Sequence, residues 1–215
     1  MKKNIKHIWF DFSETLAFLK KERHDQLRYK NYAQVVNRPI TEELKVEYEA
    51  LYKKFNNSNA ALFSSLGLSS KRWSEIINSV PPEELYILAA EKIPSILQEV
   101  KLHVPISIFS NIQLKSVLPA LGIDPSWFTH TISAGMVEHP KPALDGFYKM
   151  IDLSGIPAEN ILYIGDHVGK DVLPAKQVGI QAGIVWSSSD EADYSFEKFE
   201  DILRLFDSSA ETLHA

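Results

Sequence analysis

The chain has 215 residues, which is enough for one good core or for a core with a small inserted domain. Its formal net charge is −5 and it has neither a basic stripe nor an arginine cluster, so we expect no nucleic acid or acidic membrane as a partner and favour a small ligand. It contains no cysteine, which excludes disulfides, thiolate zinc sites and cysteine nucleophiles. No apolar run approaches the length of a membrane span and no signal peptide is recognisable, so we expect a cytoplasmic protein; its oligomeric state stays unknown at this level.

The first predicted strand ends in a carboxylate. Residues 5–10 form a short apolar run that stops at Asp11, and the polar residues Ser13, Glu14 and Thr15 follow. A buried parallel strand with a functional C-terminal end has this pattern, so we interpret Asp11 as a nucleophile. The alternative is that Asp11 only caps a helix, which is the commoner use of such an aspartate. We favour the nucleophile because later strand ends also carry polar groups that suit the same site.

A helical segment follows the first strand. The pattern predicts helices over residues 18–36, from Thr41 to Phe55, over 60–66, after Ser70, and from Pro81 onward. Residues 17–85 are therefore predicted to form a small helical cap, inserted between two parts of the core, residues 1–16 and 86–215. The aromatic side chains of this segment are interpreted as packing.

From about residue 89 onward, strands and helices alternate. The predicted strands are 104–109, 130–134, 161–164 and 181–186, and the predicted helices are 94–101, 113–121, 144–153, 172–178 and 196–206. This alternation predicts an α/β fold with a parallel sheet covered by crossover helices. The tail from Ser208 is expected to fray.

Further polar residues follow the later strands. Ser110 and Asn111 follow one strand, Asp166 and Asp171 follow another, and Lys141 lies between two prolines that favour extended backbone. Because the carboxyl ends of parallel strands face one crevice, we expect these groups to converge with the nucleophile. Carboxylates without histidine or thiolate partners suit Mg²⁺, which keeps waters for a substrate phosphate. Ser110, Asn111 and Lys141 are the candidates for binding the phosphoryl group.

Four motifs carry a resemblance to a known family. They read FDFSETL, IFSN, EHPKP and YIGDHVGKDVLPAKQVGI. In this order and spacing, the motifs resemble those of the haloacid dehalogenase superfamily, with a helical cap of the C1 type inserted after the first motif. The resemblance covers nearly the whole chain. It implies a Rossmann-like core with a mobile cap that closes over the site and selects the substrate.

The resemblance also implies roles for the site residues. Asp11 would form a covalent aspartyl intermediate, supported by Ser110 and Lys141. Asp11 and Asp166 would bind Mg²⁺, and Asp171 would be a direct ligand or would contact one. The implied function is a magnesium-dependent hydrolase of the phosphatase type, with a small phosphorylated metabolite as its partner.

The first motif departs from the pattern of the family's phosphatases. They have an Asp two residues after the nucleophile and then a Gly, where this chain has Ser13 and Glu14. That Asp protonates the leaving alkoxide and later deprotonates the attacking water, which is help worth roughly 10²–10⁴-fold in rate. A serine hydroxyl does not replace it near neutral pH. The backbone carbonyl of Ser13 would still bind Mg²⁺, so Ser13 stays among the candidate catalytic and metal residues.

Several explanations of Ser13 stay open. One explanation is an enzyme restricted to substrates with good leaving groups, such as acyl or aryl phosphates. Another is that Glu14 serves as a substitute acid, which we favour less because adjacent side chains usually point apart. Phosphonate- or halide-cleaving relatives also lack that Asp. Phosphonate cleavage needs a cap lysine such as Lys53 or Lys54. Halide cleavage needs no metal, so the intact loop at Asp166 argues against it. The last alternative is a catalytically impaired protein that binds a phosphate ligand.

Other polar side chains are interpreted without a catalytic role. His7, His103 and His130 lie near strand starts and are expected to be structural or exposed. His139 and His167 lie beside the site and are expected to have indirect or solvent contacts. Lys115 and Lys170 are expected to be surface charges.

Overall fold

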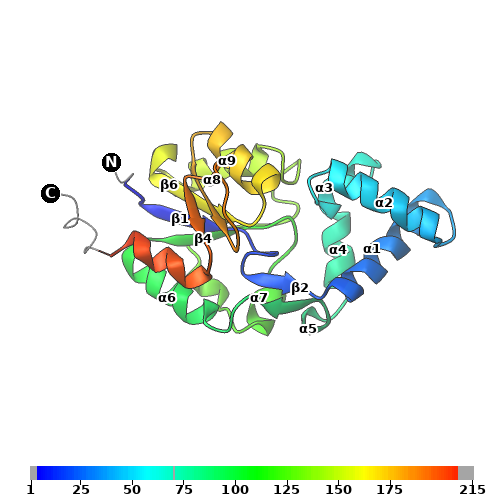
Figure 1. Cartoon of the computed structure of the whole chain (residues 1–215), viewed down its shortest axis with the longest axis horizontal. Coiled ribbons are helices and arrows are strands. Elements are labelled where there is room, and N and C mark those ends of the chain that lie inside the picture. Colours follow the sequence, from blue (N-terminus) through cyan, green and yellow to red (C-terminus); the bar gives the residue numbers. More distant parts are fainter. Residues whose placement is uncertain (1–3, 70, 208–215) are drawn as a thin grey trace.

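The computed structural model describes residues 4–69 and 71–207. Ser70, which precedes a predicted helix, and the tail from Ser208 lie outside the described residues. A six-stranded sheet forms the core (Figure 1), and all its strand pairings are parallel. In spatial order its strands are β5 (Thr131–Ile132), β4 (Ile106–Phe109), β1 (His7–Phe10), β6 (Ile161–Gly165), β7 (Gln181–Val185) and β8 (Tyr194–Phe196). The predicted α/β fold with a parallel sheet is confirmed.

Strand β1 lies inside the sheet, between β4 and β6. All four of its residues are buried, as expected for a strand in a parallel sheet that is covered on both faces. Its last residue, Phe10, is paired with Ile108 of β4 and with Ile164 of β6. The carboxyl ends of these three strands are therefore nearly level, which brings the residues that follow them to one edge of the sheet.

Helices cover both faces of the sheet (Figure 1). Side chains of β1 alternate between two hydrophobic cores: Ile8 and Phe10 belong to one, and Trp9 belongs to the other. The first core includes residues of α6 (Ile93–His103), α7 (Val117–Ala120) and the 3₁₀-helix η4 (Phe199–Leu205). The second includes residues of α8 (Asp145–Ser154) and α9 (Leu173–Gln177). Among the described residues, no helix is both long and apolar enough to span a bilayer.

Short 3₁₀- and π-helical turns complete the core. They are η1 (Pro125–Trp127), η2 (Ala158–Asn160) and the π-helical η3 (Val168–Val172), which leads directly into α9. π-helical turns are rare in proteins, and those that occur often lie at functional sites. Here it follows the carboxyl end of β6.

The segment between β1 and the rest of the core is mostly helical. Its helices are α1 (Lys21–Val36), α2 (Glu42–Lys54), α3 (Asn59–Ser65), α4 (Arg72–Asn78) and α5 (Pro82–Leu85). The hydroxyl of Thr41 accepts a hydrogen bond from Leu44 N at 3.2 Å and so caps the start of α2. These helices lie to one side of the sheet, beyond its carboxyl edge (Figure 1), and we call them the cap.

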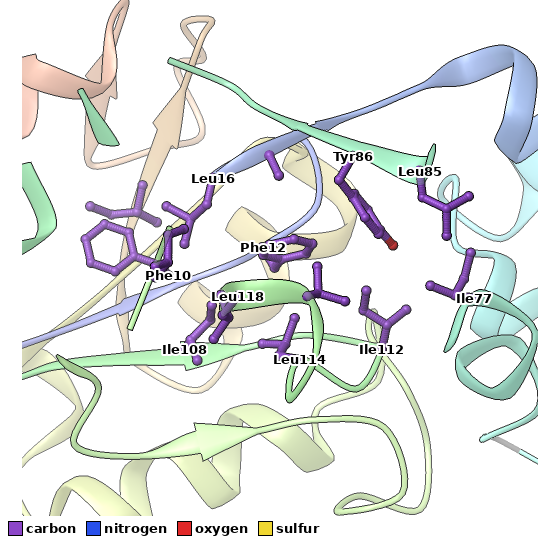
Figure 2. Packing of buried hydrophobic residues seen from close by; sticks show 14 of the residues in the cluster. Phe10, Phe12, Leu16, Ile77, Leu85, Tyr86, Ile108, Ile112, Leu114 and Leu118 are labelled. Carbon is purple, nitrogen blue, oxygen red and sulfur yellow. The ribbon is translucent and has the colours of Figure 1, made fainter. Parts of the chain in front are cut away.

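Two short strands join the cap to the core. β2 (Ala17–Leu19) and β3 (Tyr86–Leu88) pair antiparallel, so the chain leaves and re-enters the core side by side. Beneath them the first hydrophobic core continues from the sheet toward the cap (Figure 2). Figure 2 shows Phe12 next to Tyr86, with Leu85 and Ile77 beyond. The core and the cap therefore share one apolar cluster.

Several predicted elements differ from the observed ones. The predicted helix 113–121 is reduced to α7, because Gln113 N donates to Ser74 Oγ of the cap at 2.7 Å instead of entering a helix. The last helix was predicted from Phe196, but Phe196 ends β8, since Trp186 N donates to Phe196 O at 2.8 Å, and the helical turn η4 begins only at Phe199. The strands β2 and β3 were predicted as helix and as undefined chain, and three residues are too few for a period to be recognised.

Candidate active site

The predicted site residues come together at the carboxyl edge of the sheet. Asp11 follows β1, Ser110 follows β4, and Asp166 follows β6, while Asp171 lies in η3. Oxygen atoms of the three aspartates lie within 4.8 Å of one another. The level ends of β1, β4 and β6 place these side chains together, as the strand pattern predicts.

Lys141 is the central cation of this cluster. Its side chain is buried, and its ammonium lies 2.7 Å from Asp11 Oδ1 and 2.9 Å from Asp171 Oδ1. It also donates to the hydroxyl of Tyr163 at 2.6 Å, and that hydroxyl lies 3.1 Å from Asp171 Oδ1. Removal of Lys141 would leave two buried carboxylates without this close cation, so Lys141, Asp11, Asp171 and Tyr163 depend on one another. Sequence reasoning missed Tyr163, which lies in the middle of β6.

The backbone of Lys141 is held by both the core and the cap. Asn111 Oδ1 accepts from Lys141 N at 2.9 Å, and Asn111 Nδ2 donates to Lys141 O at 3.0 Å. Ser58 of the cap donates to the same carbonyl at 3.1 Å. Ser110 is buried, and its hydroxyl accepts from Ile112 N at 3.3 Å. Asn111 thus positions the lysine; its predicted contact with substrate stays a prediction.

Lys170 is a site residue and not a surface charge, so the sequence interpretation of it was wrong. Its ammonium lies 3.7 Å from Asp11 Oδ2, 3.5 Å from Asp166 Oδ1 and 3.9 Å from Asp171 Oδ2. Only 12% of its side chain is exposed. The sequence signal that could have identified Lys170 is its four-residue spacing from Asp166. At the start of a helical turn this spacing places both side chains on the same face. Lys115, the other lysine expected on the surface, is exposed.

Burial and charge shift the pKa values in this cluster. Burial raises the pKa of Asp166 to about 7, against the opposing effect of Lys170. Burial alone would raise the pKa of Asp171 as well, but Lys141 and Lys170 together lower it below its ordinary value. Burial would lower the pKa of Lys170, and the surrounding carboxylates instead raise it well above its ordinary value. Asp171 and Lys170 therefore carry full charges near neutral pH.

The carboxylate cluster has the chemistry of a divalent cation site. Asp11 Oδ2 and Asp166 Oδ1 are buried and have no hydrogen-bond partner among the described residues. Buried carboxylate oxygens without a donor are costly unless a cation faces them, and oxygen ligands in this number suit Mg²⁺. The residues therefore fit the metal predicted from the sequence. Lys170 faces the same two oxygens, so the ammonium and a metal ion would compete for them.

The turn after the nucleophile is held by Glu14. Glu14 has a φ of 61°, in the left-handed region where glycine is favoured, and this is the position where the resemblance leads us to expect glycine. Its carboxylate accepts from Leu19 N at 2.8 Å, and its own N donates to Ala17 O at 2.8 Å. Glu14 is therefore engaged in the connection to the cap. Ser13 lines the cavity above the aspartates.

A cavity of about 460 Å³ opens above the cluster, between the core and the cap. Its wall includes Asp11, Lys141 and Lys170 from the core and His24 and Trp73 from the cap. Its volume is in the range of small-molecule sites.

His167 joins the core to the cap at this cavity. Its Nδ1 accepts from Gly169 N and Lys170 N, at 3.1 Å and 3.2 Å, and its Nε2 lies 3.2 Å from Asn57 Nδ2 of the cap. His167 therefore caps the π-helical turn that carries Lys170. This agrees with the indirect role expected of it.

Comparison with known families agrees with this geometry. The model of the haloacid dehalogenase-like hydrolase family matches residues 8–185, which include every site residue described above. The chain belongs to this family. No curated protein matches its sequence.

Several solved structures have folds similar to that of this haloacid dehalogenase-like hydrolase. A haloacid dehalogenase phosphatase from Thermococcus onnurineus has 18% identity and a TM-score of 0.70, over 94% of this chain and 98% of that one. A predicted phosphoglycolate phosphatase from Haemophilus somnus has 18% identity and a TM-score of 0.65, over 94% and 98%. YfnB of Bacillus subtilis, a hydrolase of the same superfamily bound to magnesium, has 15% identity and a TM-score of 0.62, over 95% and 100%. At these identities the likeness establishes a common fold.

Proposed function

We propose that this hydrolase is a magnesium-dependent phosphatase that acts on a small phosphorylated metabolite through an aspartyl-phosphate on Asp11. The observation that carries the proposal is the buried cluster in which Asp11 faces two ammonium groups and two further carboxylates at the floor of a cavity. Two of the similar structures, from Thermococcus onnurineus and Haemophilus somnus, are described as phosphatases. Both support a phosphoryl group as the reacting part of the substrate.

The residues divide the reaction between them. Lys141 holds Asp11 in place through a 2.7 Å contact and balances the charge that collects on the phosphoryl oxygens. Ser110, at the end of β4, lines the same cavity and is placed to donate to a phosphoryl oxygen. One oxygen of Asp11 forms a bond to phosphorus while the ester bond breaks, and its electron pair leaves with the departing oxygen. Water then cleaves the aspartyl-phosphate, which releases inorganic phosphate and restores the carboxylate.

A bound Mg²⁺ would neutralise phosphoryl charge and reduce its repulsion from Asp11. Asp11, Asp166 and the carbonyl of Ser13 are the proposed ligands, with Asp171 as a ligand or as a contact of one. Asp11 Oδ2 and Asp166 Oδ1, which are buried and have no hydrogen-bond donor among the described residues, support this assignment. The ammonium of Lys170 faces the same oxygens, so it would have to move aside for a metal ion.

Ser13 restricts the leaving group. No carboxylic acid stands at this position to protonate a departing alkoxide, and Glu14 is engaged with Leu19 N. Without general acid help an alkyl phosphate would react roughly 10²–10⁴-fold more slowly, whereas acyl and aryl phosphates need little protonation. We therefore propose acyl or aryl phosphates as the preferred classes.

The test is phosphate release from an aryl, an acyl and several alkyl phosphates, with Mg²⁺ and with a chelator. The wild type is expected to release phosphate only with Mg²⁺, and Asp11→Asn is expected to be inactive. Ser13→Asp is expected to gain activity on alkyl phosphates. Asp152→Asn, a change of the same type at an exposed position of α8, is the matched control. Turnover that survives in Asp11→Asn would refute the aspartyl-phosphate. Tight binding without turnover of any substrate would indicate a protein that only binds phosphate ligands.

Phosphonate cleavage is the second candidate, because Lys53 of the cap lines the cavity. This chemistry needs a lysine that forms a Schiff base with a carbonyl group of the substrate. Borohydride treatment in the presence of a carbonyl-bearing phosphonate would then attach a stable adduct to Lys53, detectable by mass spectrometry. Absence of the adduct on wild-type protein, with phosphatase activity present, would exclude this candidate.

A further inference from the structure

The part of the cavity away from the aspartates has an aromatic and apolar wall. The residues that give it this character come from the cap, from the strands that join it to the core, and from the loop after β4: Leu19, His24, Trp73, Tyr86 and Ile112. This wall is the surface that a leaving group would meet once the phosphoryl group lies against Asp11 in the cavity. Its composition therefore carries information about the substrate.

The aromatic rings of this wall are fixed by one another. The His24 ring lies edge-on to Tyr86, with centroids 5.3 Å apart, and 6.4 Å from the Trp73 ring. Trp73 is stacked on Phe63 at 5.7 Å, and Tyr86 lies edge-on to Phe12 at 5.2 Å. Figure 2 shows Tyr86 beside Phe12, which follows the nucleophile directly. These ring contacts hold the side chains of the wall in one arrangement.

His24 offers an unused hydrogen-bonding group in this wall. It is only 4% exposed, and the Leu85 backbone is its one hydrogen-bonding neighbour among the described residues, so at least one ring nitrogen has no partner. Burial lowers its pKa to about 4, against a smaller opposing effect of the Leu85 backbone. The ring is therefore neutral at pH 7, with one donor and one acceptor. A buried polar group of this kind, on the wall of a cavity, is satisfied when a ligand supplies the partner.

The charges around the wall balance. Besides the catalytic cluster, the cavity is lined by three cationic and three anionic side chains: Lys21, Arg28 and Lys53, and Glu14, Asp25 and Glu49. The cap cations are largely paired, since Arg28 Nη2 lies 2.7 Å from both Asp25 and Glu49. Lys21 lies 2.6 Å from Asp25. Lys53 has no ion pair among the described residues, but its side chain is exposed. A negatively charged leaving group on the aromatic wall would meet the two carboxylates that already face Arg28.

We propose that the cap holds an uncharged aromatic leaving group against Trp73 and Tyr86, with a hydrogen bond to His24, so that the substrate is an aryl phosphate. This inference rests on the proposed phosphatase function and narrows it. The oxygen–phosphorus bond of the ester breaks as the Asp11–phosphorus bond forms, and the electron pair leaves as a phenolate. A phenol has a pKa of about 10, so the phenolate needs no acid at the position of Ser13 and takes its proton from water. The missing acid and the aromatic wall thus point to the same substrate class.

Binding to the Asp11→Asn variant in the presence of Mg²⁺ tests the proposal without turnover. The probes are phenyl phosphate, 4-carboxyphenyl phosphate, β-glycerophosphate and inorganic phosphate, measured by titration calorimetry. Phenyl phosphate is expected to bind at least tenfold more tightly than the other three. In the same background, Trp73→Leu is expected to weaken the binding of phenyl phosphate about three- to tenfold, because an aromatic contact is worth about 0.5–1.5 kcal/mol. The binding of inorganic phosphate is expected to weaken less than twofold. Trp127→Leu, outside the cavity wall, is the matched control and should change neither.

Equal weakening of both ligands by Trp73→Leu, or phenyl phosphate binding no tighter than phosphate, would overturn the proposal. Circular dichroism checks that each variant is folded, and if Trp73→Leu is not, His24→Gln carries the same comparison. Turnover assays of the wild type distinguish a failure of this inference from a failure of the proposed phosphatase function. Turnover without an aromatic preference would refute the aromatic site alone, whereas an aromatic preference without turnover would refute the phosphatase and leave the site standing.

Discussion

Replacement of Lys170 by methionine is the sharpest test of how the charges in the site are arranged. The change keeps a long unbranched side chain and removes the ammonium that lies 3.5–3.9 Å from three carboxylates. Among the residues that the structure describes, Lys141 would then be the only cation left in contact with Asp11 and Asp171. We expect the variant to be less stable without metal and to bind Mg²⁺ more tightly.

The size of both effects follows from the geometry. Removing one partner from a buried ion pair costs about 3–5 kcal/mol, and the Lys170 side chain is only 12% exposed, so this range applies. For a chain of this size such a loss lowers the melting temperature by roughly 10 °C. If Mg²⁺ binds these oxygens as proposed, it would have to displace the ammonium in the wild type but not in the variant. Recovery of even 1.4–3 kcal/mol of that cost corresponds to a rise in Mg²⁺ affinity of about ten- to a hundredfold.

Thermal unfolding followed by circular dichroism, in a chelator and in Mg²⁺, measures the stability, and titration calorimetry measures the affinity. Lys115→Met, a change of the same type at an exposed position, is the control and should alter neither. An unchanged melting temperature in chelator would show that the Lys170 ammonium contributes nothing to folding. An unchanged or weaker Mg²⁺ affinity would refute the competition between the ammonium and the metal.

Three further predictions concern other parts of the site. Tyr163→Phe removes a hydroxyl bonded to Lys141 and should lower the free energy of unfolding by about 1.5–3 kcal/mol in urea titrations, and an effect below 0.5 kcal/mol would contradict its role. Asn111→Ala frees the backbone of Lys141 and should lower kcat about 10- to 100-fold with little change in KM, measured by phosphate release; a rise in KM alone would instead make Asn111 a substrate contact. His24 has a pKa of about 4 when folded and 6.5 when unfolded, so the unfolded chain gains a proton first as the pH falls, and stability should drop by up to about 3 kcal/mol between pH 6.5 and 4. That part of the pH dependence should be missing in His24→Gln.

The strand ends were predictable from the sequence because each combines an apolar run with a polar residue at its end. Asp11, Ser110 and Asp166 follow β1, β4 and β6, whose paired registers bring them together. Tyr163 gave no such signal, since it lies within a strand and its role depends on which face it occupies. Lys170 was misjudged because a charged residue in a helical turn is usually solvated, and only the fold reveals that this turn points into the site.

Contacts between distant segments explain the rest of what the sequence did not indicate. Ser58 of the cap bonds to the carbonyl of Lys141, which is 83 residues away, and no local pattern encodes such a pair. The strands β2, β3 and β8 have three residues each, too few for a period to be recognised. The aromatic side chains of the cap were interpreted as packing, and Trp73 does pack, yet it also lines the cavity, as does Tyr86 of β3.

The position of β1 inside the sheet has a consequence for how the chain is made. Ile8 pairs with Ile106 and Leu162, so the strand leaves the ribosome about 100 residues before its first partner and about 150 before its second. At a synthesis rate of about 5–20 residues per second, this apolar strand waits roughly 5–30 s unpaired. The cap is translated during this interval, and its helices depend largely on local contacts. Chaperones that shield short apolar segments would therefore act on the first dozen residues of this protein, while its cap is already folding.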